Sequence, residues 1–241
     1  MEEERGILTG ELWKETSFNL FKGDVLYKKI KEVSTMKVSM IYMASGFGKR
    51  YGTNKLITEF RGEPLYLHGL LSLQKAAKLL EKTEKINCQL ILISQYERVL
   101  SGSVEQVPEA ERFFNEDSDQ GITASIKLGT EVAWDNADAY LYFVADQPCM
   151  AGETIARFVS EFMKSKKGIG CVCAKGHRGS PNIFRRRYKK ELLALEGDQG
   201  GRQIMQKYPQ EIWMMEVDER ELKDIDQPAD LTALRLELEN T

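Results

Sequence analysis

The sequence contains few of the features that mark secreted, membrane-spanning or nucleic-acid-binding proteins. Its 241 residues include only 4 cysteines, 6 prolines and 2 histidines, and its formal net charge is −3. Four scattered cysteines are too few for a disulfide framework, so we expect plain thiols and a reducing, cytoplasmic compartment. No apolar run approaches the roughly 20 residues of a membrane span, and the acidic start, residues 1–4, is unlike a signal peptide. We therefore expect neither a membrane nor a nucleic acid as a partner, although a local loop can still hold a small anion.

What is present is the composition of an ordered globular protein. Hydrophobic residues make up 42% of the chain and charged residues 29%, which excludes disorder over most of its length. Residues 1–35 contain aromatic and charged side chains but no clear strand, and they predict at most one or two short amphipathic helices without chemistry. We therefore divide the chain into an N-terminal extension, 1–35, and a domain, 36–241.

From Met36 onward, apolar runs of strand length alternate with helical patterns. Fully apolar runs predict strands buried on both faces, and apolar residues spaced by three and four predict amphipathic helices. Strands are expected at 38–43, 90–93, 140–144, 168–174, 182–184 and 212–217, helices at 65–80, 122–134, 153–166 and from 229, and a basic turn at 175–180. This alternation predicts a doubly wound α/β fold, Rossmann-like, with a mostly parallel sheet.

Three polar segments are expected at one edge of this sheet. They are the loop after Met43, the turn after Val144 and the segment after Val217. Ligands bind doubly wound sheets outside the carboxyl ends of the strands, where these segments would converge. The sequence therefore predicts a ligand site built from all three.

The first of these segments runs from Ala44 to Lys55 and reads ASGFGKRYGTNK. Its glycines would let backbone N–H groups approach phosphate oxygens, and Lys49, Arg50 and Lys55 add positive charge. The loop matches neither the dinucleotide-binding fingerprint, because Tyr51 stands where glycine is needed, nor the Walker A motif. We interpret it as a phosphate-binding loop, the alternative being a glycine-rich turn with solvated charges.

Carboxylates mark the other two segments. Asp146 directly follows a buried strand and would be costly to leave unpaired, so a Mg²⁺ ion that bridges phosphate oxygens is a natural partner. A helix cap or a pair with an arginine is an equal alternative. Asp224 and Asp226 precede Pro228, where carboxylates cap helices as often as they bind ligands.

The sequence resembles a known family in six blocks. They are MASGFGKRYGTNKL at 43–56, Asn115 with GITAS at 121–125, ADQP at 145–148, GSPNIF at 179–184, ELLALEGDQGGR at 191–202 and DIDQPAD at 224–230. In this order they resemble the motifs of the molybdopterin nucleotidyltransferases, a family of MobA-like NTP transferases. The resemblance covers about residues 37–236 and is greatest to the molybdenum cofactor cytidylyltransferases. Ser45 and Tyr51 depart from the usual loop, which has alanine and methionine there.

This resemblance implies a nucleotidyltransferase fold and Mg²⁺-dependent transfer of CMP from CTP to molybdopterin, with release of pyrophosphate. Arg50, Lys55 and Asp146 would be catalytic, and the metal ligands would be Asp146 with Asp226, or with Asp224 in its place. The nucleotide side would comprise Ala44, Ser45, Gly46, Phe47, Gly48, Lys49, Arg50, Lys55, Asn115 and Ser125. The pterin side would comprise Gly179, Ser180, Pro181, Asn182, Gly200, Gly201 and Arg202. A client molybdoenzyme is a further expected partner.

Other functions are weighed against this one. Guanylyltransferases usually carry Leu-Ala-Gly-Gly in the loop, so Ala44-Ser45-Gly46 favours CTP over GTP. Transfer to a sugar or alcohol phosphate would use the same chemistry with a different acceptor. A non-catalytic carrier of the molybdenum cofactor would have no use for both Lys55 and Asp146, which argues against that class. The two histidines are expected to have no catalytic role.

Overall fold

The computed structural model of the protein describes residues 35–46, 51 and 54–239. Residues from Met36 onward form one compact unit. The predicted extension, apart from Thr35, lies outside the described residues, as do six members of the predicted phosphate loop, namely Phe47, Gly48, Lys49, Arg50, Gly52 and Thr53. Predictions about these residues, and the division of the chain at residue 35, stay predictions.

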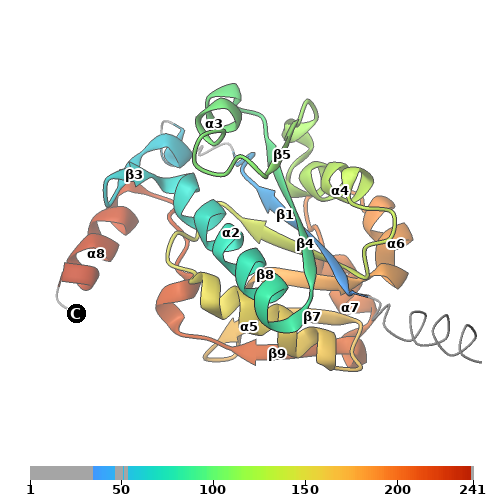
Figure 1. Ribbon diagram of the computed structural model, residues 1–241. Helices are drawn as coiled ribbons and strands as arrows, with labels where there is room; N and C mark the ends of the chain where they lie inside the picture. Colours follow the sequence, from blue (N-terminus) through green and yellow to red (C-terminus); the bar gives the residue numbers. More distant parts are fainter. Residues whose placement is uncertain (1–34, 47–50, 52–53, 240–241) are drawn as a thin grey trace, which may run out of the picture. The chain divides into compact units, whose positions relative to one another are not determined.

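A seven-stranded, mostly parallel sheet forms the centre of the described unit (Figure 1). Its strands are β1 (Lys37–Met43), β4 (Asn87–Ser94), β5 (Glu111–Phe114), β6 (Ala139–Val144), β7 (Ile169–Ala174), β8 (His177–Arg185) and β9 (Ile212–Glu216). They lie in the order β5-β4-β1-β6-β8-β7-β9, and β8 runs antiparallel to both of its neighbours. The predicted doubly wound α/β fold with a mostly parallel sheet is confirmed.

Helices cover both faces of this sheet (Figure 1). One face packs against α2 (Leu65–Glu84) and α5 (Gly152–Lys164), and the other against α4 (Ile122–Val132), α6 (Lys189–Leu193) and α7 (Arg202–Lys207). Strand β1 lies between these layers, so Met40 and Tyr42 pack on the first face while Ile41 and Met43 pack on the second. Each apolar side chain buried in this way contributes about 1.5–3 kcal/mol relative to exposure. A strand that lies between two helical layers therefore requires apolar side chains on both of its faces.

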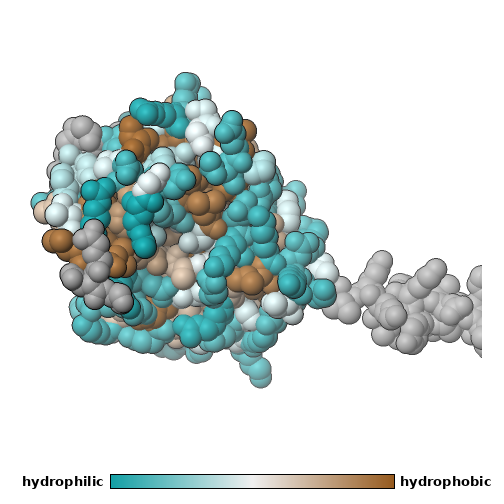
Figure 2. Space-filling model, turned by 60° about the vertical axis from the view of Figure 1, so that its left-hand side comes forward, coloured by the Kyte–Doolittle hydropathy of each residue, from teal (hydrophilic) through white to brown (hydrophobic). Residues whose placement is uncertain are grey.

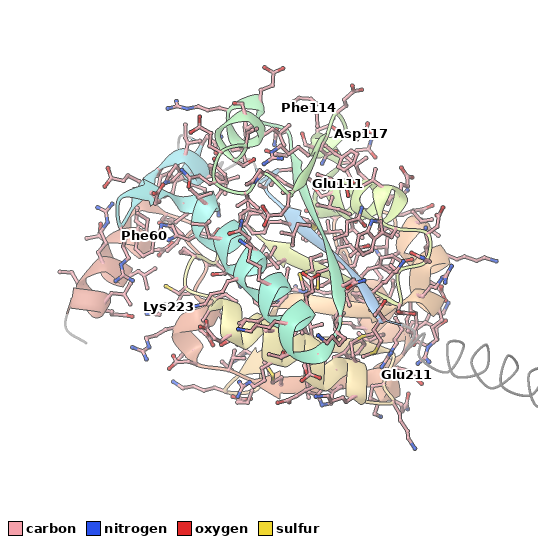
Figure 3. All side chains as sticks on the ribbon, in the orientation of Figure 1. Phe60, Glu111, Phe114, Asp117, Glu211 and Lys223 are labelled. Carbon is pink, nitrogen blue, oxygen red and sulfur yellow. The ribbon has the colours of Figure 1, made fainter. Side chains whose placement is uncertain are left out.

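A smaller apolar cluster lies beside the main core. It joins the hairpin of β2 (Glu59–Phe60) and β3 (Glu63–Pro64) to the last helix, α8 (Pro228–Glu239). Phe60, labelled in Figure 3, packs there with Leu231 and Leu234. The remaining short helices are α3 (Glu97–Gly102) and the 3₁₀ helices η1 (Lys55–Ile57), η2 (Ser118–Gln120), η3 (Arg186–Tyr188), η4 (Pro209–Glu211) and η5 (Glu219–Leu222).

The predicted basic turn at 175–180 is present but too long by four residues. Strand β8 begins at His177, so the turn is confined to Lys175 and Gly176, both with positive φ (49° and 80°). Two left-handed residues make the tight hairpin turn that returns the chain antiparallel beside β7. The pairing of β8 with β6 and β7 therefore overrides the turn signal of the polar and glycine residues that follow.

The surface is mixed in character. On the face in Figure 2, hydrophobic residues lie in separate patches among hydrophilic ones. The large exposed apolar side chains come from different elements and are Val104, Phe114, Ile122, Met214 and Leu236. Of these, Phe114 ends the edge strand β5, whose first residue, Glu111, accepts a hydrogen bond from Gln89 of β4 at 2.9 Å (Figure 3).

Among the described residues, no helix is both long and apolar enough to cross a membrane.

Candidate active site

The three predicted polar segments meet at the carboxyl ends of β1 and β6. These strands pair in parallel up to Met43 and Val144, and Ala145 N then donates to Met43 O at 3.1 Å. The segment near the end of the chain reaches the same place because Ile225 N donates to Asp146 O at 3.0 Å. Sheet pairing and this loop contact thus bring together residues as far apart in the sequence as Met43 and Ile225. The predicted convergence is confirmed in the backbone.

Lys55 lies between two aspartates of these segments. Its Nζ donates to Asp146 Oδ2 at 3.0 Å and to Asp226 Oδ1 at 3.1 Å. The Asn54 side chain fixes the start of η1 by accepting from Leu56 N at 3.1 Å, which holds Lys55 in place. The side chain of Lys55 is 7% exposed, against 27% for Asp146 and 50% for Asp226. The site is therefore open on the Asp226 side.

The charge of Lys55 is stabilised by these partners. Burial alone would lower the pKa of the ammonium, but the charge of Asp146 and the hydrogen bonds to Asp146 and Asp226 outweigh it, so the pKa is raised above 10.5. Lys55 is therefore cationic at neutral pH.

The carboxylates can hold a divalent cation. Asp146 Oδ1 is buried and has no hydrogen-bond partner among the described residues, so one hard oxygen ligand is available. The described chain gathers no group of three or more histidine, cysteine or acidic side chains that could enclose a metal by itself. Two carboxylates suit Mg²⁺, which usually keeps waters and substrate phosphates as its other ligands.

Asp224 points to a different partner from Asp226. It accepts a hydrogen bond from Gln147 Nε2 at 2.8 Å, whereas Asp226 contacts Lys55. Burial raises the pKa of Asp224, the charge of Asp146 raises it further, and the bond from Gln147 partly opposes them. Of the two candidates for a second metal ligand, Asp226 contacts the ammonium group of Lys55 together with Asp146, whereas Asp224 is bonded to Gln147.

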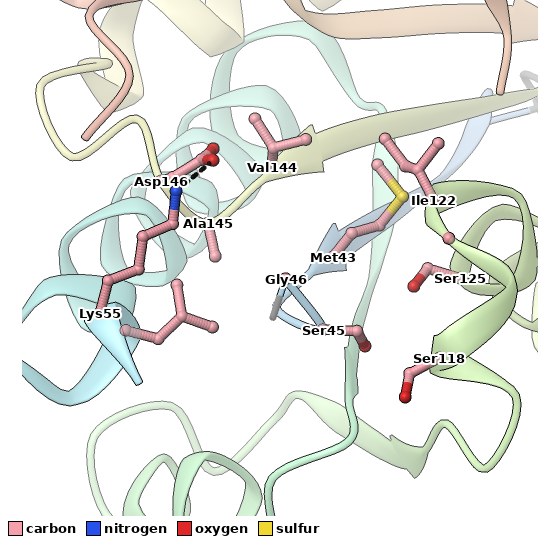
Figure 4. Close-up of a pocket in the computed structure, with 12 residues that line it drawn as sticks. Met43, Ser45, Gly46, Lys55, Ser118, Ile122, Ser125, Val144, Ala145 and Asp146 are labelled. Atoms are coloured by element: carbon pink, nitrogen blue, oxygen red, sulfur yellow. Dashed lines mark hydrogen bonds and ion pairs between the residues drawn. The ribbon is translucent and has the colours of Figure 1, made fainter. Parts of the chain in front are cut away.

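A small cavity of about 180 Å³ extends from the lysine (Figure 4). Lys55 and Asp146 lie at one end, and the hydroxyl side chains of Ser45, Ser118 and Ser125 lie at the other. Asn115 orders this end, since its Nδ2 donates to Ser125 Oγ at 3.0 Å. The predicted nucleotide-side residues within the described chain are thus brought together. Ser45, Gly46, Lys55 and Ser125 line the cavity, whereas Ala44 and Asn115 are buried beside it and are not among its lining residues.

A larger cavity of about 640 Å³ adjoins the first and shares Asp146 with it. Six of the seven residues predicted for the pterin side line it, namely Gly179, Ser180, Asn182, Gly200, Gly201 and Arg202. Pro181, the seventh, is not among the lining residues. The sequence-based reasoning missed Tyr142 and Phe184, which also line this cavity. Both looked like ordinary core residues of apolar runs, so nothing in the sequence marked them.

The two cavities are also joined by the first turn of α4. Gly121 precedes this helix with φ 81°, and Ile122 N donates to Asp198 Oδ1 at 3.0 Å. A Cβ at position 121 would collide with the Asp198 carboxylate, so both the φ angle and the space require glycine. Asp198 lies in the loop that leads to Gly200. From there it caps the N-terminus of α4, the helix that carries Ser125.

Comparison with protein families identifies the domain. The family model of the MobA-like NTP transferase domain matches residues 40–212. No curated protein sequence matches the chain.

Solved structures share the fold at low sequence identity. Rv0371c from Mycobacterium tuberculosis H37Rv, in complex with manganese, superposes with a TM-score of 0.66 at 20% identity, covering 83% of this chain and 98% of that one. The 4-diphosphocytidyl-2C-methyl-D-erythritol synthase from Anaerococcus prevotii gives 0.67 at 12% identity, covering 85% and 99%. A nucleotidyl transferase from Methanothermobacter gives 0.67 at 17% identity, covering 86% and 99%. The expected nucleotidyltransferase fold is thereby confirmed.

Proposed function

Because this chain belongs to the MobA-like NTP transferase family, we propose that it transfers CMP from CTP to molybdopterin, releasing pyrophosphate. The observation that carries the proposal is the position of Asp146. It lines both cavities and contacts Lys55, so a triphosphate in one cavity and an acceptor phosphate in the other would meet at this residue. A site for two anionic substrates that share one cluster of charges is what nucleotidyl transfer needs.

The chemistry requires no nucleophile from the protein. A phosphate oxygen of the acceptor would attack the α-phosphorus of CTP, forming one P–O bond while the bond to the β-phosphate breaks and pyrophosphate leaves. The protein supplies position and charge: Lys55 would bind the triphosphate, and Arg50 is proposed to assist it. Asp146 and Asp226 would hold Mg²⁺, and when bound this ion would neutralise phosphate charge. The manganese in the complex of Rv0371c supports a divalent cation in this fold.

The nucleotide and the acceptor are assigned to different cavities. Ser45, Ser118 and Ser125 supply hydroxyl groups that could bind the ribose or the base in the smaller one, and Asn115 would orient Ser125 for this role. The larger cavity offers Arg202 and peptide groups of glycine residues to the pterin and its phosphate. The loop Ala44-Ser45-Gly46 favours CTP, and the name of the Anaerococcus relative specifies a cytidyl product.

The setting of the reaction is part of the proposal. We place the protein in the cytoplasm, which four free cysteines support. A molybdoenzyme that receives the finished cofactor is the proposed client.

The proposal is tested by measuring pyrophosphate. Purified protein, Mg²⁺ and molybdopterin are incubated with CTP, GTP, ATP or UTP in parallel, and the CTP reaction should dominate. Lys55→Ala should lower kcat/KM for CTP. The loss of transition-state stabilisation calculated from kcat/KM should be about 3–4 kcal/mol, which is the effect of removing one preorganised donor at a reacting oxygen. Lys75→Ala is the matched control, because Lys75 pairs with Glu153 on the surface.

Each other outcome selects another function. Faster turnover with GTP would identify a guanylyltransferase, and turnover only with a sugar or alcohol phosphate would identify a different acceptor. Binding of molybdopterin without pyrophosphate release from any nucleotide would identify a carrier.

A further inference from the structure

Three consecutive side chains, beginning with the last residue of β4, bind three consecutive carbonyl oxygens after β1. Each donor lies fifty positions after its acceptor in the sequence. The bonds are Ser94 Oγ to Ala44 O at 2.8 Å, Gln95 Nε2 to Ser45 O at 2.6 Å and Tyr96 OH to Gly46 O at 3.0 Å. The last acceptor is the residue before position 47, where the predicted phosphate loop continues.

These bonds begin where the sheet ends. The parallel pairing of β1 with β4 stops at Met43 and Ile93, and one further backbone bond runs from Ala44 N to Ile93 O at 2.8 Å. Beyond this point the chain leads toward α3, and within the described part of the chain no further backbone hydrogen bond joins it to the segment after β1. Ser94 Oγ also accepts from Tyr96 N at 3.1 Å, which fixes the donors relative to one another. Over these three residues, side-chain donors thus take the place of the backbone hydrogen bonds that paired β1 with β4.

The bonds determine which way the peptide groups face. In a trans peptide unit the C=O and the following N–H point in opposite directions. Because the carbonyls of Ala44 and Ser45 point to the β4 side, the N–H groups of Ser45 and Gly46 point away from it. Both residues line the smaller cavity, and a Cβ added at Gly46 would meet nothing within 4 Å. Backbone N–H groups directed at open space are the donors that bind phosphate.

We propose that Gln95 and Tyr96 are positioning residues for the start of the loop: Gln95 directs the N–H group of Gly46 toward the triphosphate, and Tyr96 anchors the carbonyl group of the same residue. This inference rests on the proposed function, since it assumes that an NTP occupies the smaller cavity. Neither side chain is assigned contact with the nucleotide, so both act through the loop. The orientation of the loop would serve the bound ground state and the transition state alike, which predicts an effect on KM with little effect on kcat.

The test compares four variants of the full chain. Tyr96→Phe removes one hydroxyl and Gln95→Met removes one amide donor, while Tyr208→Phe and Gln74→Met remove the same groups from bonds to Glu191 and Glu109 elsewhere. In Tyr96→Phe and in Gln95→Met, the KM for CTP and the inhibition constant of inorganic pyrophosphate should each rise about five- to tenfold, the size of one lost hydrogen bond. The kcat and the KM for the acceptor should stay within about twofold, and both control variants should resemble the wild type.

The outcomes separate this inference from the proposed function. If the wild type turns over CTP and the two variants match it in KM and in pyrophosphate inhibition, the positioning role is overturned and the function stands. A lowered melting temperature with reduced kcat but unchanged KM would also overturn it, because that pattern indicates a purely structural role. A wild type that neither binds nor turns over any NTP overturns the proposed function, and this inference with it.

Discussion

Asp146 binds Lys55 through one carboxylate oxygen, Oδ2, while its other oxygen, Oδ1, is buried without a partner among the described residues. Asp226 binds the same ammonium. Lys55 is therefore the counter-ion of both carboxylates, in the place where a divalent ion would satisfy them. A metal that takes both oxygens must compete with the lysine, and a bound triphosphate would offer the lysine another anion.

The first prediction follows from this competition. Lys55→Met should bind Mn²⁺ at least about tenfold more tightly than the wild type when no nucleotide is present, because removing a cation next to two carboxylates removes a repulsion of more than about 1.4 kcal/mol. Isothermal titration calorimetry measures the affinity directly, and Lys75→Met is the control. Equal or weaker Mn²⁺ binding by Lys55→Met would show that the two cations do not share the site.

The second prediction concerns Asp146. Asp146→Asn should reduce CMP transfer by about 100-fold or more, because one ligand charge is lost where triphosphate charge must be neutralised. The melting temperature should change by no more than about 4 °C, since Lys55 keeps Asp226 as a partner. Asp135→Asn, at a fully exposed position, is the control. Turnover at the wild-type rate would remove Asp146 from the mechanism.

The third prediction concerns pH. The pKa of Lys55 is raised in the folded protein above its ordinary value of 10.5, so folding favours the protonated lysine. Its contribution to the free energy of unfolding should be complete below pH 10.5 and should be lost as the pH rises through the raised pKa. Urea unfolding of the wild type and of Lys55→Met between pH 8.5 and 11 measures this difference. A difference that stays constant over this range would contradict the prediction.

The fourth prediction concerns packing behind the site. A Cβ on Gly69 of α2 would lie 2.5 Å from the hydroxyl oxygen of Tyr42, which donates to Tyr66 O at 2.7 Å. Gly69→Ala should therefore destabilise the protein by about 1–3 kcal/mol, although alanine favours helices. Denaturant unfolding measures the change. Adding Tyr42→Phe, which removes the colliding oxygen, should recover part of the loss, and no recovery would show that the collision is not the cause.

The fifth prediction concerns the extension. A chain that begins at Met36 should fold with a melting temperature within about 4 °C of the full chain and should bind CTP with the same affinity. Scanning calorimetry and nucleotide titration measure both quantities. Aggregation of the shortened chain would indicate that Trp13, Phe18 or Phe21 completes the core.

The sequence predicted six of the seven strands of the central sheet at least in part, including the edge strand β9, and missed the other edge. Strands β1, β4 and β6 are buried on both faces, and their apolar runs follow from that position. The edge strand β5 was missed because Glu111–Phe114 is short and begins with two charged residues, as a half-exposed edge allows. Helix α2 extends four residues beyond its predicted end, to Glu84, because the polar last turn carries no apolar signal.

The site was predicted unevenly for a related reason. Residue type and order indicated Lys55 and Asp146, but which of Asp224 and Asp226 meets the lysine depends on how an irregular segment folds across the sheet. Gln95 and Tyr96 were missed because their partners are carbonyl oxygens, which every residue has and no sequence pattern displays.

The hydrogen bond from Ile122 N to Asp198 has a thermodynamic consequence for two-substrate binding. It ties the loop next to the larger cavity to the helix that carries Ser125 of the smaller one. A molecule that immobilises the loop or the helix also reduces the conformational freedom of the other. The second molecule to bind then has a smaller conformational-entropy cost. The coupling free energy is reciprocal: whatever factor the nucleotide adds to acceptor affinity, the acceptor returns to nucleotide affinity. Under the proposed assignment of the two substrates, this helix cap is therefore expected to make their binding cooperative.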